Sequence, residues 1–357
     1  MSDDSKAPAL KMPAEWEPHE RTWMAFPTPN ATFGPREAES LERARRAWSR
    51  VARVISRYEK VSVVAHPDDA DAARNALGDV ADIVLAPLDD AWIRDSGPTF
   101  VHGPQGGLVA VDWVFNGWGA QEWASWEHDS KVAASIAATA AVSVSQSSLV
   151  NEGGGFHVDG RGTVLLTETV QLDPDRNPGA TRHEVERLLH EQLGTTKAIW
   201  LPRGLTRDYD QFGTRGHVDI VAAFAGAGTV LLHHQADPRH PDHAVSRQLQ
   251  ESLCGAVDAS GQQLRVIDVP APTALTDDDG FLDWSYINHY VGNGVVVLCA
   301  FQDPHDEVAA QILQEVYPDR VIELVDARDI FAFGGGIHCI TQQQPVPRQM
   351  TLSQEDA

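Results

Sequence analysis

Residues 37–65 read EAESLERARRAWSRVARVISRYEKVSVVA, a helix pattern followed by a short apolar run. Apolar side chains recur in the first part at intervals of three and four residues, which places them on one helix face: Leu41, Ala44, Trp48, Val51, Ala52 and Ile55. The run VSVVA at 61–65 predicts a strand. This pair of a helix and a strand is the smallest unit of the predicted fold.

Four further pairs follow the same order. They are predicted at 130–140 with 142–144, 181–193 with 198–201, 242–254 with 264–269, and 306–316 with 320–325. A recurring unit of this size cannot bury its own apolar face and must pack against its neighbours. We therefore predict an α/β fold of five units that closes into a ring. Ahead of the first unit, residues 12–27 are rich in aromatic residues and bracketed by prolines, which predicts an edge strand.

The chain is strongly acidic, with 28 Lys and Arg against 51 Asp and Glu and a formal net charge of -23. Such a field repels phosphate backbones and anionic lipids and attracts cations. We expect a cationic small-molecule partner, no nucleic acid and no membrane, with plain solubility charge as the alternative interpretation. No apolar stretch approaches the ~20 residues that span a bilayer. Three cysteines cannot pair completely, and the absence of a basic and apolar leader favours the cytoplasm.

Each unit also carries one polar, glycine-bearing or aromatic segment after its strands. These segments are WIRDSGP at 92–98, NEGGG at 151–155, GHVD at 216–219, YINHY at 286–290 and FAFGGGIHCITQ at 331–342. If the ring closes, all five segments meet at its centre. We therefore expect a central site.

Cys339 is the candidate nucleophile of that site. Three glycines precede it, and they let a ligand approach the main chain closely. Polar residues and glycines surround this thiol, as a reactive cysteine requires. Cys299 lies in the apolar run VVVLCAF, and Cys254 closes a helical stretch, so both are predicted to serve packing.

The other candidate groups are one histidine and three carboxylates. His217 and Asp219 are two residues apart, so on a strand both would point to the same face. A histidine beside a carboxylate suits general acid-base work, with a purely structural pair as the alternative. Glu152 leads into three glycines, and Asp95 lies in a stiff segment beside Arg94. This excess of negative charge favours a guanidinium substrate, whose planar N–H donors pair with carboxylates.

The central carbon of a guanidinium is electrophilic. A thiolate could attack it, expel ammonia and leave an amidino-cysteine that water then hydrolyses. A bound cation favours the thiolate, so we expect the substrate to help ionise its own nucleophile.

Several motifs together resemble the agmatine deiminase family, which is related to the bacterial peptidylarginine deiminases within the guanidine-modifying superfamily. The motifs are Met12-Pro13 through Trp23-Met24, WIRDSGP at 92–98, NEGGG at 151–155, GHVD at 216–219, YIN at 286–288 and IHCITQQQP at 337–345. The resemblance runs from about Met12 to Pro345. It implies a five-bladed α/β propeller (pentein) with pseudo-fivefold symmetry and a central active site.

The resemblance also implies a role for each candidate residue. Cys339 would be the nucleophile, and His217 the general acid-base that protonates departing ammonia and then activates water. Asp95 and Asp219 would hold the guanidinium nitrogens, with Glu152 assisting binding and proton transfer. The remaining members of the predicted substrate-binding set are Trp92 and Gly336.

The implied reaction converts agmatine and water to N-carbamoylputrescine and ammonia, a step of putrescine and polyamine metabolism. The resemblance implies no metal or organic cofactor, and it suggests a homo-oligomer. We expect a flexible N-terminus over 1–11, a single catalytic propeller domain over 12–346 and a C-terminal tail over 347–357.

Three departures from the family pattern concern the substrate. Agmatine-specific members usually carry an asparagine between the glycines and the isoleucine, whereas here Gly336 meets Ile337 directly. His289 stands where phenylalanine is typical, and Ile220 stands where asparagine is typical. These positions lie next to the catalytic residues. Another guanidine, such as free or peptidyl arginine or another guanidino-amine, is therefore an alternative substrate.

Three other functions are weighed against hydrolysis. An amidinotransferase would pass the amidino group to an amine instead of water. A non-catalytic relative would only bind a polyamine, although Cys339, His217 and Glu152 are intact. A metal hydrolase would use histidines of one loop that lack the compact spacing of zinc ligands: His233, His234, His240 and His243.

Overall fold

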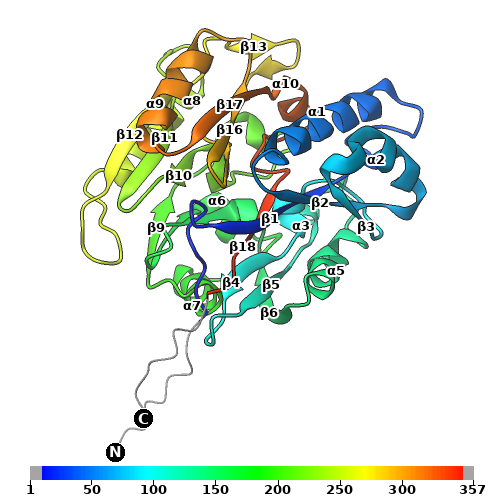
Figure 1. The fold of residues 1–357 in the computed structure, drawn as a ribbon. Coiled ribbons are helices and arrows are strands. Elements are labelled where there is room, and N and C mark those ends of the chain that lie inside the picture. Colours follow the sequence, from blue (N-terminus) through cyan, green and yellow to red (C-terminus); the bar gives the residue numbers. More distant parts are fainter. Residues whose placement is uncertain (1–9, 349–357) are drawn as a thin grey trace, which may run out of the picture.

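The structure, a computed structural model, describes residues 10–348 of the chain (Figure 1). The strands are β1 His19–Ala25, β2 Lys60–Ala65, β3 Asp82–Leu85, β4 Thr99–His102, β5 Leu108–Val114, β6 Ser143–Val150, β7 Phe156–Val158, β8 Thr163–Thr167, β9 Lys197–Leu201, β10 Ala222–Phe224, β11 Thr229–His234, β12 Arg265–Pro270, β13 Thr276–Asp277, β14 Gly280–Phe281, β15 Tyr290–Gly292, β16 Val295–Ala300, β17 Val321–Asp326 and β18 Gln342–Pro345. The α-helices are α1 Glu39–Ile55, α2 Ala70–Leu77, α3 Ile93–Ser96, α4 Gly117–Ala120, α5 Val132–Thr139, α6 Glu168–Gln171, α7 Arg182–Leu193, α8 Asp242–Leu253, α9 His305–Val316 and α10 Arg328–Phe331.

Five sheets share one connection pattern. In each, a central strand pairs antiparallel on one side and parallel on the other, and a helix crosses between the two parallel strands. The sheets are β18-β1-β2-β3, β4-β5-β6, β7-β8-β9, β10-β11-β12 and β15-β16-β17, and the crossing helices are α1, α5, α7, α8 and α9. The mixed α/β architecture and the five predicted helix-and-strand pairs are confirmed.

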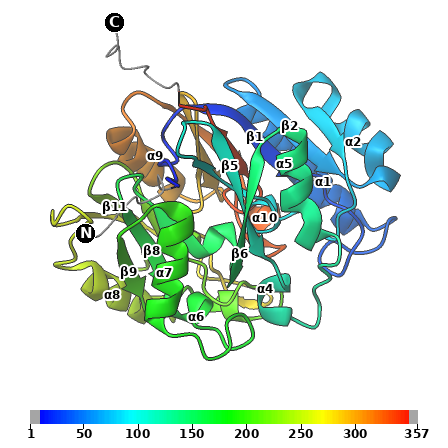
Figure 2. The same cartoon turned by 90° about the horizontal axis from the view of Figure 1, so that it is seen from below.

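The hydrophobic periodicity of α1 has the predicted consequence. All six of its predicted core residues are buried, and the helix contacts β16, β17 and α10. Figure 1 shows α1 and α2 on one side of the molecule and α8 and α9 on the other, and α10 lies between the two sides in Figures 1 and 2. The apolar face of α1 is therefore buried against one side of the hydrophobic core.

Helix α7 begins and ends with local signals in the sequence. Thr181 and Glu184 form a capping box at its start. Gly194 ends it with a left-handed backbone, φ 67°, and packs against the carbonyl of Leu10 so closely that a side chain there would collide.

Two expectations about strands and packing were wrong. Strand β1 lies between β18 and β2, not at an edge, because Pro13, Pro18 and Pro27 all fall outside its bounds and leave its N–H groups free to pair. Cys254 is exposed because it follows Leu253, the last buried residue of α8. Cys299 in β16 is buried, as predicted.

The ends of the described chain are held by backbone pairing. Lys11 and His102 exchange two backbone hydrogen bonds, and the N–H of Arg348 donates to the carbonyl of Gly106. Most of the predicted N-terminal segment 1–11 and tail 347–357 lies outside the described residues. Within residues 10–348, no helix is long and apolar enough to cross a membrane.

Candidate active site

The five predicted segments occupy the connections that lead from one sheet to the next. Helix α3 connects β3 to β4, residues 151–155 connect β6 to β7, and residues 216–219 connect β9 to β10. Residues 286–289 lead into β15, and residues 337–341 join α10 to β18. The five segments therefore occupy equivalent positions between separate sheets, and the predicted site residues come from four of them.

The thiol of Cys339 is buried, with 3% of the residue exposed. The amide of Asn288 donates from Nδ2 to Sγ over 3.3 Å, and Asp219 Oδ2 lies 3.8 Å from Sγ. Asn288 Oδ1 accepts the backbone N–H of His338 over 3.0 Å and also lies 3.4 Å from Sγ, within reach of the thiol proton. Asn288 was not among the predicted site residues, although it lies in the segment 286–290.

Two glycines keep space clear beside the thiol. A side chain at Gly335 would lie 2.9 Å from Trp92 and 3.1 Å from Cys339 Sγ. A side chain at Gly336 would lie 2.4 Å from Asn288 Oδ1. Trp92 is therefore next to the segment that carries Cys339, and Gly336 makes room for the Asn288 amide.

His217 lies between two carboxylates. Its Nε2 is 3.3 Å from Glu152 Oε2, and its Nδ1 is 3.8 Å from Asp95 Oδ1. The expectation that His217 and Asp219 share a strand face was wrong, because Val218–Ile220 forms a 3₁₀ turn and the strand β10 begins only at residue 222. The carboxylate that orients His217 is consequently Glu152, from another sheet.

Gly154 marks the point on which the charged groups converge. A side chain there would lie 2.5 Å from His217 Nδ1, 3.0 Å from Asp219 Oδ2 and 3.1 Å from Asp95 Oδ1. Among the described residues, the buried atoms His217 Nδ1 and Asp219 Oδ1 have no hydrogen-bond partner. A buried carboxylate oxygen without a donor is a favourable place for the N–H groups of a cation.

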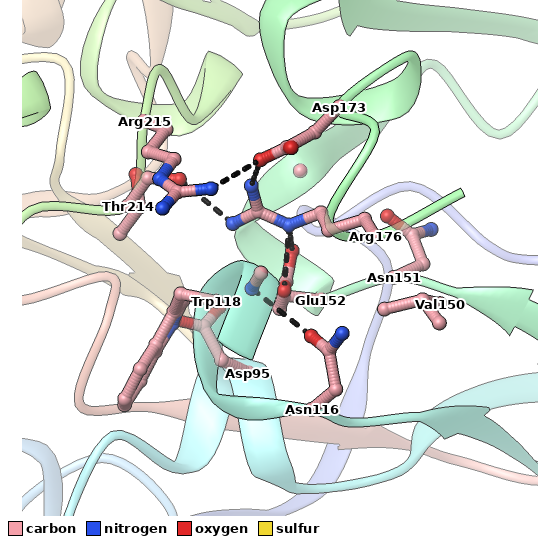
Figure 3. Close-up of polar contacts among 12 residues, drawn as sticks. Asp95, Asn116, Trp118, Val150, Asn151, Glu152, Asp173, Arg176, Thr214 and Arg215 are labelled. Carbon is pink, nitrogen blue, oxygen red and sulfur yellow. Dashed lines mark hydrogen bonds and ion pairs between the residues drawn. The ribbon is translucent and has the colours of Figure 1, made fainter. Parts of the chain in front are cut away.

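The sequence interpretation missed the buried Arg176, which fixes Glu152 (Figure 3). Arg176 Nε donates to both carboxylate oxygens of Glu152, over 2.9 and 3.1 Å. Its Nη1 donates to Asp173 over 2.9 Å and its Nη2 to the carbonyl of Thr214 over 2.7 Å. Asp173 also accepts from Arg215. Glu152 is therefore held rigidly beside His217.

Asp219 is fixed by a second buried chain of polar groups. His338 Nδ1 lies 2.7 Å from Asp219 Oδ2, and His338 Nε2 lies 2.9 Å from Glu15 Oε1. The other oxygen of Glu15 is 3.4 Å from Nε2 of His157. Glu15, His157 and His338 form a three-ligand group that geometry alone would allow to hold a metal. However, the N–H of Phe224 donates to His157 Nδ1, so Nε2 carries the proton and has no lone pair to offer a metal.

The carboxylates control the protonation of His217. Burial alone would lower its pKa, but Asp95, Glu152 and Asp219 outweigh burial and raise it to about 9. Burial would raise the pKa of Glu152, yet Arg176 and then His217 lower it below its usual value. At neutral pH the site therefore contains an imidazolium beside an ionised Glu152.

Burial and neighbouring carboxylates shift both the thiol of Cys339 and the carboxyl of Asp95 toward their neutral forms, although Asp95 stays ionised at neutral pH. Burial, followed by the charges of Asp219 and Asp95, raises the pKa of Cys339 well above its ordinary value. Burial, with Asp219 and Glu152 opposing His217, raises the pKa of Asp95 to about 6. A cation bound among these carboxylates would relieve the repulsion that opposes thiolate formation.

Two of the three departures from the family pattern, Ile220 and His289, occupy different surroundings. Ile220 packs in a hydrophobic cluster with Leu205 and Val221. His289 lines a narrow internal gap that also borders Asp219 and His338. Burial lowers the pKa of His289 to about 4, so it is neutral at physiological pH.

The loop histidines considered for a metal hydrolase do not converge. His240 bonds to the carbonyl of Leu282, His243 lies against the carbonyl of Gln235, and His233 lies 3.1 Å from the hydroxyl of Ser285. Among residues 10–348, the group at Glu15 is the only one of three potential ligands within reach of one another. The geometry gives the metal-hydrolase alternative no site in this loop.

Arg176→Met is expected to destabilise the protein by about 3–5 kcal/mol, because it leaves the buried Glu152 carboxylate without its main partner. Urea unfolding measures this loss. Arg187→Ala is the control, since Arg187 pairs with Glu191 on the exposed face of α7 and its loss is expected to cost at most about 0.5 kcal/mol. Equal losses for the two variants would contradict the structural importance of the buried pair.

This chain is similar to known deiminases along nearly its whole length. Residues 11–345 match the family model of the Porphyromonas-type peptidyl-arginine deiminases. A Streptomyces coelicolor protein provisionally named agmatine deiminase is 62% identical over 337 residues, covering 94% of this chain and 99% of that protein. The agmatine deiminase of Stutzerimonas stutzeri is 39% identical and covers 94% of this chain and 95% of its own. A solved structure of Enterococcus faecalis agmatine deiminase is 30% identical, with a TM-score of 0.89 and coverage of 97% of this chain and 99% of that one.

Proposed function

Since this chain belongs to the Porphyromonas-type peptidyl-arginine deiminase family and is a hydrolytic deiminase acting on C–N bonds, we propose that its substrate is agmatine. The products are N-carbamoylputrescine and ammonia. The observation that carries this proposal is the convergence of the Cys339 thiol, the His217 imidazole and the carboxylates of Asp95 and Asp219 around Gly154 and Gly335.

A bound guanidinium brings positive charge to a site whose carboxylates carry an excess of negative charge. Asp95 and Asp219 hold the guanidinium N–H groups, and Trp92 lies beside them against the glycine segment. The bound cation offsets the two carboxylate charges that oppose ionisation of Cys339. Asn288 donates a hydrogen bond that stabilises the thiolate.

The first chemical step forms a bond between Cys339 Sγ and the central guanidinium carbon. The C–N bond to one terminal nitrogen then breaks, and His217 transfers its proton to the departing ammonia. Glu152, itself held by Arg176, keeps that proton on His217 until the transfer. The result is a covalent amidino-cysteine and a neutral imidazole.

The second step reverses the role of His217. The neutral imidazole takes a proton from water, whose oxygen attacks the amidino carbon. The C–S bond then breaks and restores the Cys339 thiolate, and loss of the remaining hydroxyl proton to solvent gives the neutral ureido product. Because water is the acceptor, this cycle differs from that of an amidinotransferase, in which an amine would take the same place.

We further propose that the five sheets close as a five-bladed propeller forming one catalytic domain over 12–346. The support is the shared connection pattern and the equivalent placement of the five site segments. A closed arrangement with pseudo-fivefold symmetry explains how residues as distant as Asp95 and Cys339 reach one centre. A homo-oligomer remains part of the proposal through the family resemblance, and a cytoplasmic setting through the unpaired cysteines.

The proposal is tested by incubating the purified protein with agmatine and measuring ammonia and ureido product together. We expect both products in equal amounts without an added amine or metal. Amine-dependent turnover with no ammonia would instead identify an amidinotransferase. Rapid turnover of free arginine with little turnover of agmatine would assign a different guanidine to the same chemistry.

The pH dependence of kcat/KM is expected to be bell-shaped. Asp95 is charged above about pH 6, so guanidinium binding weakens as pH falls through that value. His217 carries its proton below about pH 9, so protonation of ammonia is lost as pH rises through that value. Initial rates at constant ionic strength measure both limbs. A profile that stays flat across either limb would contradict the corresponding assignment.

A further inference from the structure

The segment that precedes β1 places one buried carboxylate close to the centre of the site. Glu15 is 6% exposed, and its Oε1 lies 2.9 Å from His338 Nε2. His338 Nδ1 lies 2.7 Å from Asp219 Oδ2, which is in turn 3.8 Å from Cys339 Sγ. Glu15 is therefore two hydrogen bonds from a carboxylate that borders the thiol, although 323 positions of sequence separate Glu15 from His338.

Both ring nitrogens of His338 face a carboxylate, Glu15 on one side and Asp219 on the other. An ionised carboxylate only accepts hydrogen bonds, so each of these nitrogens must carry a proton and the ring is a cation. Burial would raise the pKa of both carboxyl groups, but neighbouring groups, led by His338, hold both pKa values below their usual range. The three side chains therefore form a buried chain in which an imidazolium lies between two carboxylates.

Glu15 helps His338 to keep this charge. Burial, and then the charge of Arg94, would lower the pKa of His338, but Glu15 and Asp219 outweigh both and raise it. Arg94 Nη1 lies 3.4 Å from Glu15 Oε1, and Arg94 Nε donates to the carbonyl of His338 over 3.3 Å. The other titratable groups that border the same internal gap are His157, His289 and Tyr317. A neutral side chain in place of Glu15 would leave Asp219 as the one carboxylate bonded to the ring.

This chain controls the orientation of Asp219. His338 occupies Oδ2, whereas the buried Oδ1 has no hydrogen-bond partner among residues 10–348. A neutral or displaced His338 would leave Asp219 freer to turn and would raise the pKa of its carboxyl group. The charge and the position of the ring thus keep one oxygen of an ionised Asp219 open to a donor.

We propose that Glu15 is a positioning residue for the deimination: through His338, it holds Asp219 so that one carboxylate oxygen stays free for a guanidinium N–H. The inference rests on the proposed function, because it takes Asp219 as a group that binds the guanidinium. The alternative role of Glu15 is to anchor the segment before β1. In that case its loss would lower stability without acting through His338.

A double-mutant cycle on kcat/KM for agmatine separates these two roles. Glu15→Gln keeps the shape and a hydrogen-bond acceptor but removes the charge, whereas His338→Asn keeps a neutral donor toward Asp219 but is too short to reach Glu15. Glu15→Gln is expected to lower kcat/KM about tenfold in the wild type and less than about twofold in His338→Asn. Equal losses in both backgrounds would overturn the inference. Glu17→Gln is the control, because Glu17 pairs with Arg348 at the surface and its loss should change kcat/KM less than about twofold.

NMR of isotope-labelled histidine rings adds a readout that needs no turnover, and His338→Asn identifies the signal of His338. At about pH 6 both ring nitrogens of His338 should carry protons in the wild type, and Glu15→Gln should lower the midpoint of this titration by at least about one pH unit. A neutral ring in the wild type at that pH, or an unchanged midpoint in Glu15→Gln, would overturn the inference even if agmatine is hydrolysed. A shifted midpoint in a protein that does not hydrolyse agmatine would reject the proposed substrate and retain the link from Glu15 to Asp219.

Discussion

Cys339→Ser is expected to lower the rate of ammonia release from agmatine by at least about 10⁴-fold. A serine hydroxyl ionises far less readily than a thiol, and the carboxylates Asp219 and Asp95 already oppose an anion at this position. The substitution removes one nucleophilic atom and changes little volume. Circular dichroism and urea unfolding should therefore match the wild type.

Cys254→Ser is the matched control for this variant. Cys254 is exposed at the end of α8 and should retain full activity when replaced. Mass spectrometry of acid-quenched reactions adds a direct readout, since the wild type should carry an amidino adduct on Cys339 during turnover. Substantial ammonia release by Cys339→Ser, or an adduct on another residue, would reject the nucleophile assignment.

His217→Ala is expected to reduce kcat by about 10²–10⁴-fold, the usual contribution of a positioned acid-base group. Both chemical steps lose their proton carrier, because Asp95 and Glu152 are themselves fixed by other groups. His183→Ala is the control, since His183 is exposed on α7 and should have no effect.

Two further measurements on His217→Ala distinguish the loss of a proton-transfer group from a disturbance of the structure. The alkaline limb of the pH profile near 9 should disappear in this variant, and added imidazole should restore part of the rate. An unchanged alkaline limb would remove His217 from the proton transfers, even if kcat fell. A loss of binding in place of a loss of kcat would indicate a purely structural role.

Local patterns in the sequence were sufficient to predict the five crossing helices and the parallel strands that follow them. The stripe from Leu41 to Ile55 is a property of consecutive residues, so its burial in α1 follows without knowledge of the rest of the chain. The neighbours of β1 were not predictable in this way. Its partner β18 lies at the other end of the chain, and the prolines around β1 suggested an edge that tertiary pairing removes.

The predicted nucleophile, histidine and carboxylates converge as the motifs indicated, whereas their supporting residues were missed. Arg176 lies among acidic residues of a polar loop, a composition typical of a solvated surface, and only the fold brings it to Glu152. Asn288 and His338 lay within quoted motifs, but nothing in the sequence indicates which groups they contact. Contacts between residues that are far apart in the sequence produce no periodic pattern from which they could be predicted.

The pairing of β18 with β1 makes completion of the chain a condition for catalysis. During synthesis His19 is made long before Pro345, with which it pairs, and at about 5–20 residues per second the interval lasts on the order of tens of seconds. Throughout that time one edge of β1 is open to pairing with other nascent chains. The segment that carries Cys339 leaves the ribosome just ahead of β18. A prematurely terminated chain therefore combines an inactive site with an aggregation-prone edge, which makes it a natural target for chaperones and proteases.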